Sequence, residues 1–236
     1  MYLAIIPARS GSKRIANKNI KLFLKKPIIS YSITEAKKTN LFKEIIVSTD
    51  SNKIKKIANK FGSKVYYLRS SKLSNDHCPI EDVLIDMLLF LKKKKMLTKY
   101  FCLIYATAPL IDKNDLIKSF KILDNSNLKV DSVAAIAEFS YPIQRGLRIN
   151  NQGFVEMINK KYKYYRSQDL EKSYHDAAVF SWFKTNNFLN KVKKKNLNAL
   201  GYVLPNNKVQ DIDYHEDWKT AEFKYQLIKR INKLKK

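Results

Sequence analysis

The sequence lacks any long run of apolar residues. No stretch approaches the roughly 20 apolar residues that a membrane-spanning helix needs. The first residues, Met1–Ile6, lead directly into a polar loop, without the basic segment and the long apolar stretch of a signal peptide. We therefore expect a cytoplasmic protein that has no membrane partner.

Cysteine is scarce too, with two residues in a chain of 236. Cys78 and Cys102 show neither CxxC spacing nor the spacing of a zinc site. Cys102 lies within the apolar run 100–105, which predicts a thiol packed in the core. The cysteines therefore indicate neither a metal centre nor a redox motif.

Acidic residues are few: 21 Asp and Glu stand against 46 Lys and Arg, giving a net charge of +25. Basic patches bind phosphate backbones, so a nucleic-acid-binding module is one interpretation. However, the lysines are scattered in short groups such as 92–95 and 193–195, and no zinc-finger, RRM or KH signature accompanies them. A coding bias towards Lys, Asn and Ile explains the charge better, and we do not expect a nucleic-acid partner.

Strand-like apolar segments alternate with amphipathic helical segments through the first 140 residues. Strands are predicted at 2–6, 45–48, 65–68, 101–105 and 132–137, with helices at 27–38, around 54–61 (closed by Gly62), around 83–91 and at 115–123. Such alternation implies right-handed crossovers and a mainly parallel sheet between helices. We therefore predict a three-layer α/β/α fold with a Rossmann-like sheet, whose ligands bind beyond the carboxyl ends of the strands.

The alternation breaks between about residues 138 and 174. Two glycines, short alternating runs and a tyrosine-rich stretch predict β-hairpins that project from the sheet. Further strands are expected at 178–183, 202–204 and 209–213, before a last helix. Because no repeat or linker marks a boundary, we expect one domain over residues 1–236, with an inserted hairpin region at about 138–176.

A polar loop follows the first predicted strand, from Ala8 to Asn19. Gly11 permits tight turns, and serine, arginine and lysine side chains supply the donors that wrap a polyphosphate. The spacing matches neither a Walker A loop nor the GxGxxG fingerprint. Composition alone favours a phosphate site and an ordinary solvated loop equally, and the place after the first strand favours the phosphate site.

Two aspartates, Asp211 and Asp213, end the predicted strand 209–213. Residues two apart in a strand share a face, which would set these carboxylates roughly 6–7 Å apart. Carboxylates facing one small site repel each other unless a cation lies between them, and Mg²⁺ binds one or two carboxylates together with phosphate oxygens. The alternative, which composition favours, is Asp213 as a helix N-cap with Asp211 exposed.

Six segments resemble motifs of the cytidylyltransferases that activate sialic-acid-type sugars, the CMP-N-acetylneuraminate synthetase family. Residues 5–19 resemble its signature loop, 68–76 its LR…LSxD segment, 105–110 its pocket-lining turn and 211–213 its D-I-D metal motif. The family usually has proline in place of Ala16 and glycine in place of Ala178. The remaining segments, 139–145 and 165–178, resemble the branch that acts on pseudaminic acid.

This resemblance implies a role for each of several residues. The implied nucleotide contacts are Ala8, Arg9, Ser12, Lys13, Lys18, Asn19, Arg69, Asp76 and Thr107. The implied sugar contacts are Tyr105, Gln144, Arg145, Arg166, Gln168, His175 and Asp176. Asp211 and Asp213 would hold Mg²⁺ and form the catalytic set with Arg9 and Lys18. Because a sugar carboxylate suits a bidentate arginine, Arg145 and Arg166 are its candidate partners, although the residues of the hairpin region could instead serve its own fold or a dimer contact.

The resemblance implies transfer of CMP from CTP to the anomeric hydroxyl of a nonulosonic acid, with release of pyrophosphate. N-acetylneuraminic, legionaminic and 3-deoxy-octulosonic acids are alternatives to pseudaminic acid as the acceptor. No side chain stands out as a general base, and we favour activation by the metal over a role for His175. The resemblance also implies a homodimer in which the hairpin region reaches into the partner's site.

Overall fold

A six-stranded sheet with the order β10-β6-β9-β5-β1-β4 forms the centre of the protein. The structure, a computed structural model, describes residues 1–126 and 129–234. The strands of the sheet are β1 (Tyr2–Pro7), β4 (Phe42–Ser48), β5 (Tyr100–Ile104), β6 (Ser132–Glu138), β9 (Tyr174–Lys184) and β10 (Ala199–Leu204). Every neighbouring pair is parallel except those of β9, which runs antiparallel to both β5 and β6.

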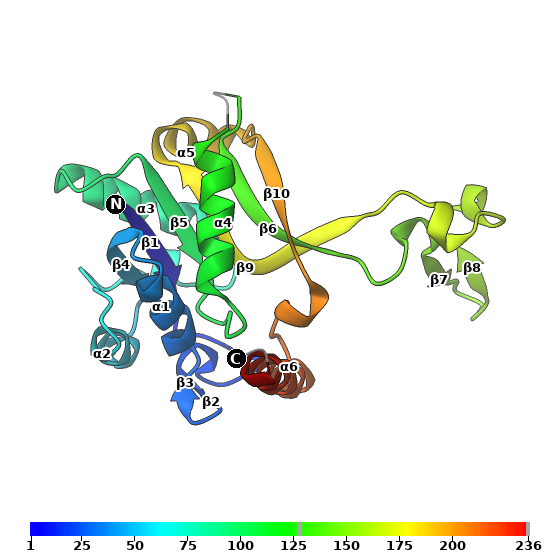
Figure 1. The fold of residues 1–236 in the computed structure, drawn as a ribbon, viewed down its shortest axis with the longest axis horizontal. Helices are drawn as coiled ribbons and strands as arrows, with labels where there is room; N and C mark the ends of the chain where they lie inside the picture. Colours follow the sequence, from blue (N-terminus) through cyan, green and yellow to red (C-terminus); the bar gives the residue numbers. More distant parts are fainter. Residues whose placement is uncertain (127–128, 235–236) are drawn as a thin grey trace.

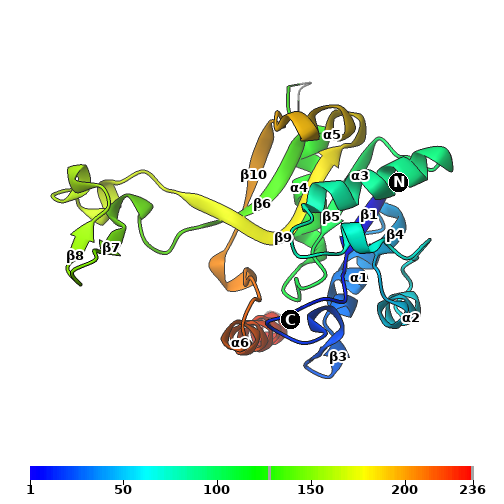
Figure 2. The same cartoon turned by 180° about the vertical axis from the view of Figure 1, so that it is seen from behind.

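Helices cover both faces of the sheet (Figure 1). The helices on one face are α1 (Ile29–Lys38), α2 (Asn52–Lys60) and α4 (Lys113–Asp124), and those on the other are α3 (Ile80–Lys93) and α5 (Thr185–Lys191), seen from behind in Figure 2. Ala4 and Ile6 of β1 join the core with α1, α2 and α4, whereas Leu3 and Ile5 join the core with α3 and α5. This alternation along one buried strand confirms the predicted three layers.

Some helices and strands differ in their bounds from the prediction. Helix α1 begins at Ile29, and Pro27 instead belongs to a small ribbon of β2 (Leu22–Phe23) and β3 (Lys26–Pro27). The predicted strand at 65–68 is reduced to two isolated bridges to β4 and its end, Ile46–Lys64 and Thr49–Leu68. Helix α2 ends at Lys60 and is closed as expected by Gly62, whose φ of 89° is left-handed.

The hairpin region leaves the sheet as an arm (Figure 1). Strands β7 (Leu147–Ile149) and β8 (Val155–Met157) pair antiparallel at its far end, so the predicted projecting hairpin is confirmed. Short 3₁₀ turns complete this arm and the connections elsewhere: η1 (Lys18–Ile20), η2 (Ser71–Leu73), η3 (Ile143–Arg145), η4 (Lys160–Tyr162), η5 (Ser167–Asp169), η6 (Val192–Lys194) and η7 (Asn206–Lys208). Large apolar side chains lie exposed along the arm, including Tyr141, Ile149 and Tyr164.

The segment 209–213 is not a strand, which corrects the prediction made for it. After β10 and η7 the chain runs without a β partner into the last helix, α6 (His215–Leu234). Ile212 is fully buried in a small separate core, which also contains Ile15 of the N-terminal loop and Trp218 of α6. This apolar cluster joins the two ends of the chain because it removes their side chains from water together.

Among the described residues, no helix combines the length and the apolar character needed to cross a bilayer.

A strained residue lies in β9 at Ala178. The pairing of β9 with β6 shifts between Ala134 and Ile136, and Ala178 has a φ of 50° at this bulge. Because a left-handed backbone costs a residue with a Cβ atom roughly 1–2 kcal/mol, Ala178→Gly is expected to raise the free energy of unfolding by about 1 kcal/mol, measured by urea denaturation. Ala177→Gly is the matched control: Ala177 is buried and has no positive φ, so this variant should lose stability. A wild-type midpoint for Ala178→Gly would show that the bulge stores no strain.

Candidate active site

The loop after β1 is tied down at both ends. The Asn19 side-chain amide donates to the Arg9 carbonyl at 2.8 Å, which closes the loop. The Ser10 N–H and hydroxyl donate to the Asp50 carboxylate at 2.8 and 2.6 Å, which anchors the loop beside the end of β4. Ala8 lies buried beneath the loop. Gly11 was predicted to permit a tight turn, but this position does not require glycine: its backbone is not left-handed, and a Cβ atom there would meet open space.

A cavity of about 310 Å³ opens under this loop, between the segment after β5 and the segment 69–83. Every predicted nucleotide contact except Ala8 lines it: Arg9, Ser12, Lys13, Lys18, Asn19, Arg69, Asp76 and Thr107. Tyr105, predicted for the sugar, lines it as well. Three separated parts of the sequence therefore meet at one hollow beyond the carboxyl ends of β1 and β5, as the rule for such sheets predicts.

Asp76 lines the cavity and pairs with two cations of the loop. It forms ion pairs with Arg9 and, at 2.5 Å, with Lys13. The hydrogen bonds from Lys13 and then from Arg9 lower the pKa of Asp76 to about 2, so the carboxylate is ionised at neutral pH. Beside it, Arg69 is buried and donates to the Ser74 hydroxyl at 3.2 Å.

Asp213 meets the other end of the loop. The Lys18 ammonium donates to the Ile212 carbonyl at 2.6 Å and lies 3.4 Å from the Asp213 carboxylate. Arg14 grips the same carboxylate with both terminal nitrogens, at 2.8 and 2.9 Å, and its guanidinium lies over the Tyr214 ring. Arg14 was not among the predicted site residues, although its place in the cationic run of the loop was a usable signal.

Asp211 has a different environment. Loss of water around its carboxylate, followed by repulsion from Asp213, raises its pKa, and the smaller opposing effects of the Lys18 charge and the Ile212 N–H do not cancel this rise. A cation would relieve both effects. The described residues contain no cluster of three or more His, Cys, Asp or Glu ligands, so these two aspartates could supply only part of a coordination shell. Two carboxylates fit Mg²⁺, which takes its other ligands from phosphate oxygens and water.

Tyr105 lines the cavity and lies within electrostatic reach of three acidic residues. Burial raises its pKa to about 12, and the negative charges of Asp176, Glu81 and Asp211 act in the same direction. The tyrosine hydroxyl is therefore un-ionised at neutral pH and can donate a hydrogen bond. Asp176 accepts from the Ala178 N–H at 2.8 Å and so holds the bulge of β9 against this region.

The predicted sugar contacts of the arm lie apart from the cavity in the same chain. Arg166 forms a bidentate pair with Asp169, at 2.7 and 3.1 Å, and Arg145 donates to the Ser167 hydroxyl at 3.2 Å. Gln144 donates to the Glu171 carbonyl at 2.8 Å. None of the arm residues Gln144, Arg145, Arg166 and Gln168 lines the cavity, and His175, at the start of β9, does not line it either.

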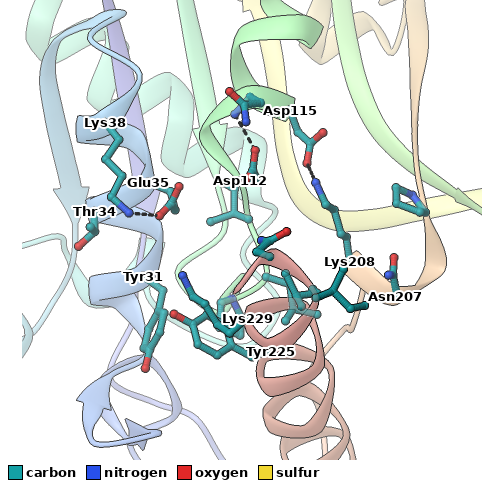
Figure 3. A pocket seen from close by; sticks show the side chains of 18 of the residues that line it. Tyr31, Thr34, Glu35, Lys38, Asp112, Asp115, Asn207, Lys208, Tyr225 and Lys229 are labelled. Carbon is teal, nitrogen blue, oxygen red and sulfur yellow. Dashed lines mark hydrogen bonds and ion pairs between the residues drawn. The ribbon is translucent and has the colours of Figure 1, made fainter. Parts of the chain in front are cut away.

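A larger hollow of about 830 Å³ lies between α1, α4 and α6. Figure 3 shows two ion pairs among its charged groups: Lys38 with Glu35, and Lys208 with Asp115. None of the predicted site residues lines it. The smaller cavity is therefore the candidate active site, because the predicted cations of the loop after β1 line it and none of them lines the larger hollow.

Comparisons with known proteins agree with the fold. The sequence model of the cytidylyltransferase family matches residues 3–236. A pseudaminic acid cytidylyltransferase of Campylobacter jejuni is 37% identical over 225 residues, which cover 95% of this chain and 96% of the relative. An N-acylneuraminate cytidylyltransferase of Escherichia coli is 26% identical over 226 residues, which cover 93% of this chain and 51% of that protein. Among solved structures, CMP:2-keto-3-deoxy-manno-octonic acid synthetase complexed with CTP superposes with a TM-score of 0.68 at 15% identity, covering 94% of this chain and 97% of that chain, and so shares its fold.

Proposed function

The chain belongs to the cytidylyltransferase family, and from this premise we propose that it transfers CMP from CTP to the anomeric hydroxyl of pseudaminic acid, with release of pyrophosphate. One observation carries the proposal: Lys18 and Arg14, which line the cavity, both pair with Asp213 of the acidic pair, although neither aspartate lines the cavity itself. The acceptor is inferred from the Campylobacter jejuni relative, which is named for pseudaminic acid and matches over nearly its whole length.

Four loop cations are well placed for the triphosphate. In the free protein each is paired with a carboxylate: Arg9 and Lys13 with Asp76, and Arg14 and Lys18 with Asp213. Binding of CTP would exchange these partners for phosphate oxygens at little cost in reorganisation. The cations would then stabilise the charge that grows on the departing pyrophosphate.

The transfer itself is an in-line displacement at phosphorus. The anomeric oxygen of the sugar forms a bond to the α-phosphate while the bond to the bridging oxygen of pyrophosphate breaks, and the hydroxyl proton passes to water. We propose that Asp211 and Asp213 hold a Mg²⁺ ion together with the phosphates. When bound, this ion would neutralise phosphate charge and lower the pKa of the attacking hydroxyl.

A substrate panel tests the proposed reaction. Purified protein with CTP and Mg²⁺ is offered pseudaminic, N-acetylneuraminic, legionaminic and 3-deoxy-octulosonic acids in turn, and pyrophosphate release is recorded. We expect the highest kcat/KM with pseudaminic acid. Absence of release with every sugar would overturn the activity, whereas a higher kcat/KM with another acid would overturn only the choice of acceptor.

We further propose one domain over residues 1–236 that works as a homodimer, with the arm of one subunit completing the sugar site of the other. The arm carries the two candidate carboxylate-binding arginines, Arg145 and Arg166, yet it extends away from the sheet (Figure 1), and neither arginine lines the cavity of its own chain. Its exposed apolar side chains are those that a subunit contact would bury. A twofold assembly would bring each arm to the other subunit.

Mixed dimers test whether the arm acts across subunits. Arg166→Ala and Asp213→Ala are each expected to be inactive alone. Mixed dimers isolated through two different affinity tags should regain about half of the wild-type activity, because one of their two sites then combines an intact arm with an intact core. Mixed dimers without activity would place the arm's function within its own chain, and failure to recover any would contradict the dimer.

A further inference from the structure

The two aspartates of the site stand on a segment that the sheet does not hold. Residues 209–213 have no β partner, and Val209 and Ile212 are its buried anchors. Apolar burial fixes how deep such a segment lies, but it does not fix the direction of its carbonyl and N–H groups. Polar groups of α6 supply that constraint.

Lys224 of α6 reaches back to the start of this segment. Its ammonium donates to the Val209 carbonyl at 2.6 Å, the Gln210 side-chain oxygen at 3.0 Å and the Asn206 carbonyl at 3.1 Å. An ammonium has three protons, and each of them has an acceptor here. No carboxylate pairs with Lys224 in the described part of the chain. Its ammonium instead bonds to the segment that leads to Asp211.

Gln210 and Asp217 extend the contact to the other side of the aspartates. The Gln210 amide donates to the Asp211 carbonyl at 3.1 Å and to the Asp217 carboxylate at 3.3 Å. Asp217 in turn accepts the Asp213 N–H at 3.0 Å. Asp217 and Lys224 are seven residues apart on α6 and so share one face of the helix. The two side chains therefore hold the main chain on both sides of Asp211.

We propose that Lys224 is a positioning residue for the divalent cation site: it fixes the Val209–Gln210 backbone and thereby the aim of the Asp211 and Asp213 carboxylates. The inference rests on the proposed function, because it assumes that these aspartates bind the metal. Groups that orient metal ligands without touching the metal change affinity by roughly 10–100-fold when removed. The same contacts would also help to anchor α6, so the test must separate an effect on the orientation of the carboxylates from an effect on the stability of the fold.

The experiment measures metal binding without turnover. Mn²⁺ is titrated into the full-length protein in the absence of CTP and sugar, and free Mn²⁺ is followed by electron paramagnetic resonance. Lys224→Met should weaken Mn²⁺ binding by about tenfold. Lys224→Arg should restore most of it, because a guanidinium also donates several hydrogen bonds. Lys229→Met is the matched control on the same helix: Lys229 lies over the Tyr225 ring, and wild-type affinity is expected.

Three outcomes decide the inference. Weak Mn²⁺ binding in Lys224→Met with a wild-type melting temperature, together with recovery in Lys224→Arg, supports it. Wild-type Mn²⁺ affinity in Lys224→Met overturns it and shows that Lys224 serves only to anchor α6. If Lys224→Met does not fold, Gln210→Leu removes one of the three Lys224 contacts together with the bridge from Gln210 to Asp217, and an unchanged affinity there overturns the inference.

Failure of the proposed function gives a different result. If the wild type binds no Mn²⁺ either alone or with CTP in the absence of sugar, or if Asp213→Ala binds it as well as the wild type, then the metal assignment itself is wrong, whatever Lys224 does.

Discussion

Asp213→Ala is expected to abolish nearly all CTP-dependent pyrophosphate release, by roughly a thousandfold or more, because loss of a metal-holding carboxylate removes several kcal/mol of stabilisation from the transition state. The fold should survive, since Asp213 is partly exposed and its ion pairs with Arg14 and Lys18 lie at the surface of the site. Turnover is measured by pyrophosphate release and folding by thermal denaturation.

The same variant should bind CTP without metal at least as tightly as the wild type. Removing the carboxylate frees Arg14 and Lys18 for phosphate oxygens. The affinity for CTP should therefore be kept or rise while turnover falls. Asp82→Ala is the control, because Asp82 forms a comparable exposed pair with Lys193, at 3.3 Å, and does not line the cavity. Wild-type turnover in Asp213→Ala would rule out Asp213 as a metal ligand.

Arg9→Ala is expected to lower turnover by roughly 10²–10³-fold, the range found when one preorganised donor to a developing charge is removed. Arg9 lines the cavity and holds Asp76, so its loss removes a phosphate partner and leaves Asp76 with Lys13 alone. Isothermal titration with CTP and the pyrophosphate assay measure the two effects separately.

Two further variants sharpen this result. Arg9→Lys keeps the charge but loses the planar fork, so it should recover part of the activity. Arg230→Ala removes an exposed arginine of α6 outside the site and should behave as the wild type. Unchanged turnover and unchanged CTP binding in Arg9→Ala would show that the loop does not hold the triphosphate.

Local signals in the sequence were enough to predict the layers and the loop. The alternation of buried residues along β1 and the amphipathic faces of α2, α3 and α4 are properties of short segments, and these elements were found as expected. The position of a polar loop after the first strand follows from the rule that ligands bind at the carboxyl ends of parallel strands. The residues around the cavity under the loop followed from these signals together with the family resemblance.

Long-range pairing was beyond the reach of local signals. Nothing in the segment 174–184 indicates that it inserts antiparallel between β5 and β6, because that choice depends on two distant partners. The prediction of a strand at 209–213 failed for a related reason: an alternating pattern shows that Ile212 is buried, but it cannot distinguish a sheet from the small core of Ile15 and Trp218. Arg14 was missed because its partner, Asp213, lies 199 residues away.

The most direct test of the account is a crystal structure of the protein grown with CTP and Mn²⁺, with an anomalous difference map recorded for manganese. We expect a manganese peak between the Asp211 and Asp213 carboxylates and the phosphates of CTP, with the triphosphate lying against Arg9, Lys13 and Lys18. CTP bound in the hollow between α1, α4 and α6, or manganese bound away from both aspartates, would contradict the central claim that the loop and the acidic pair form one site.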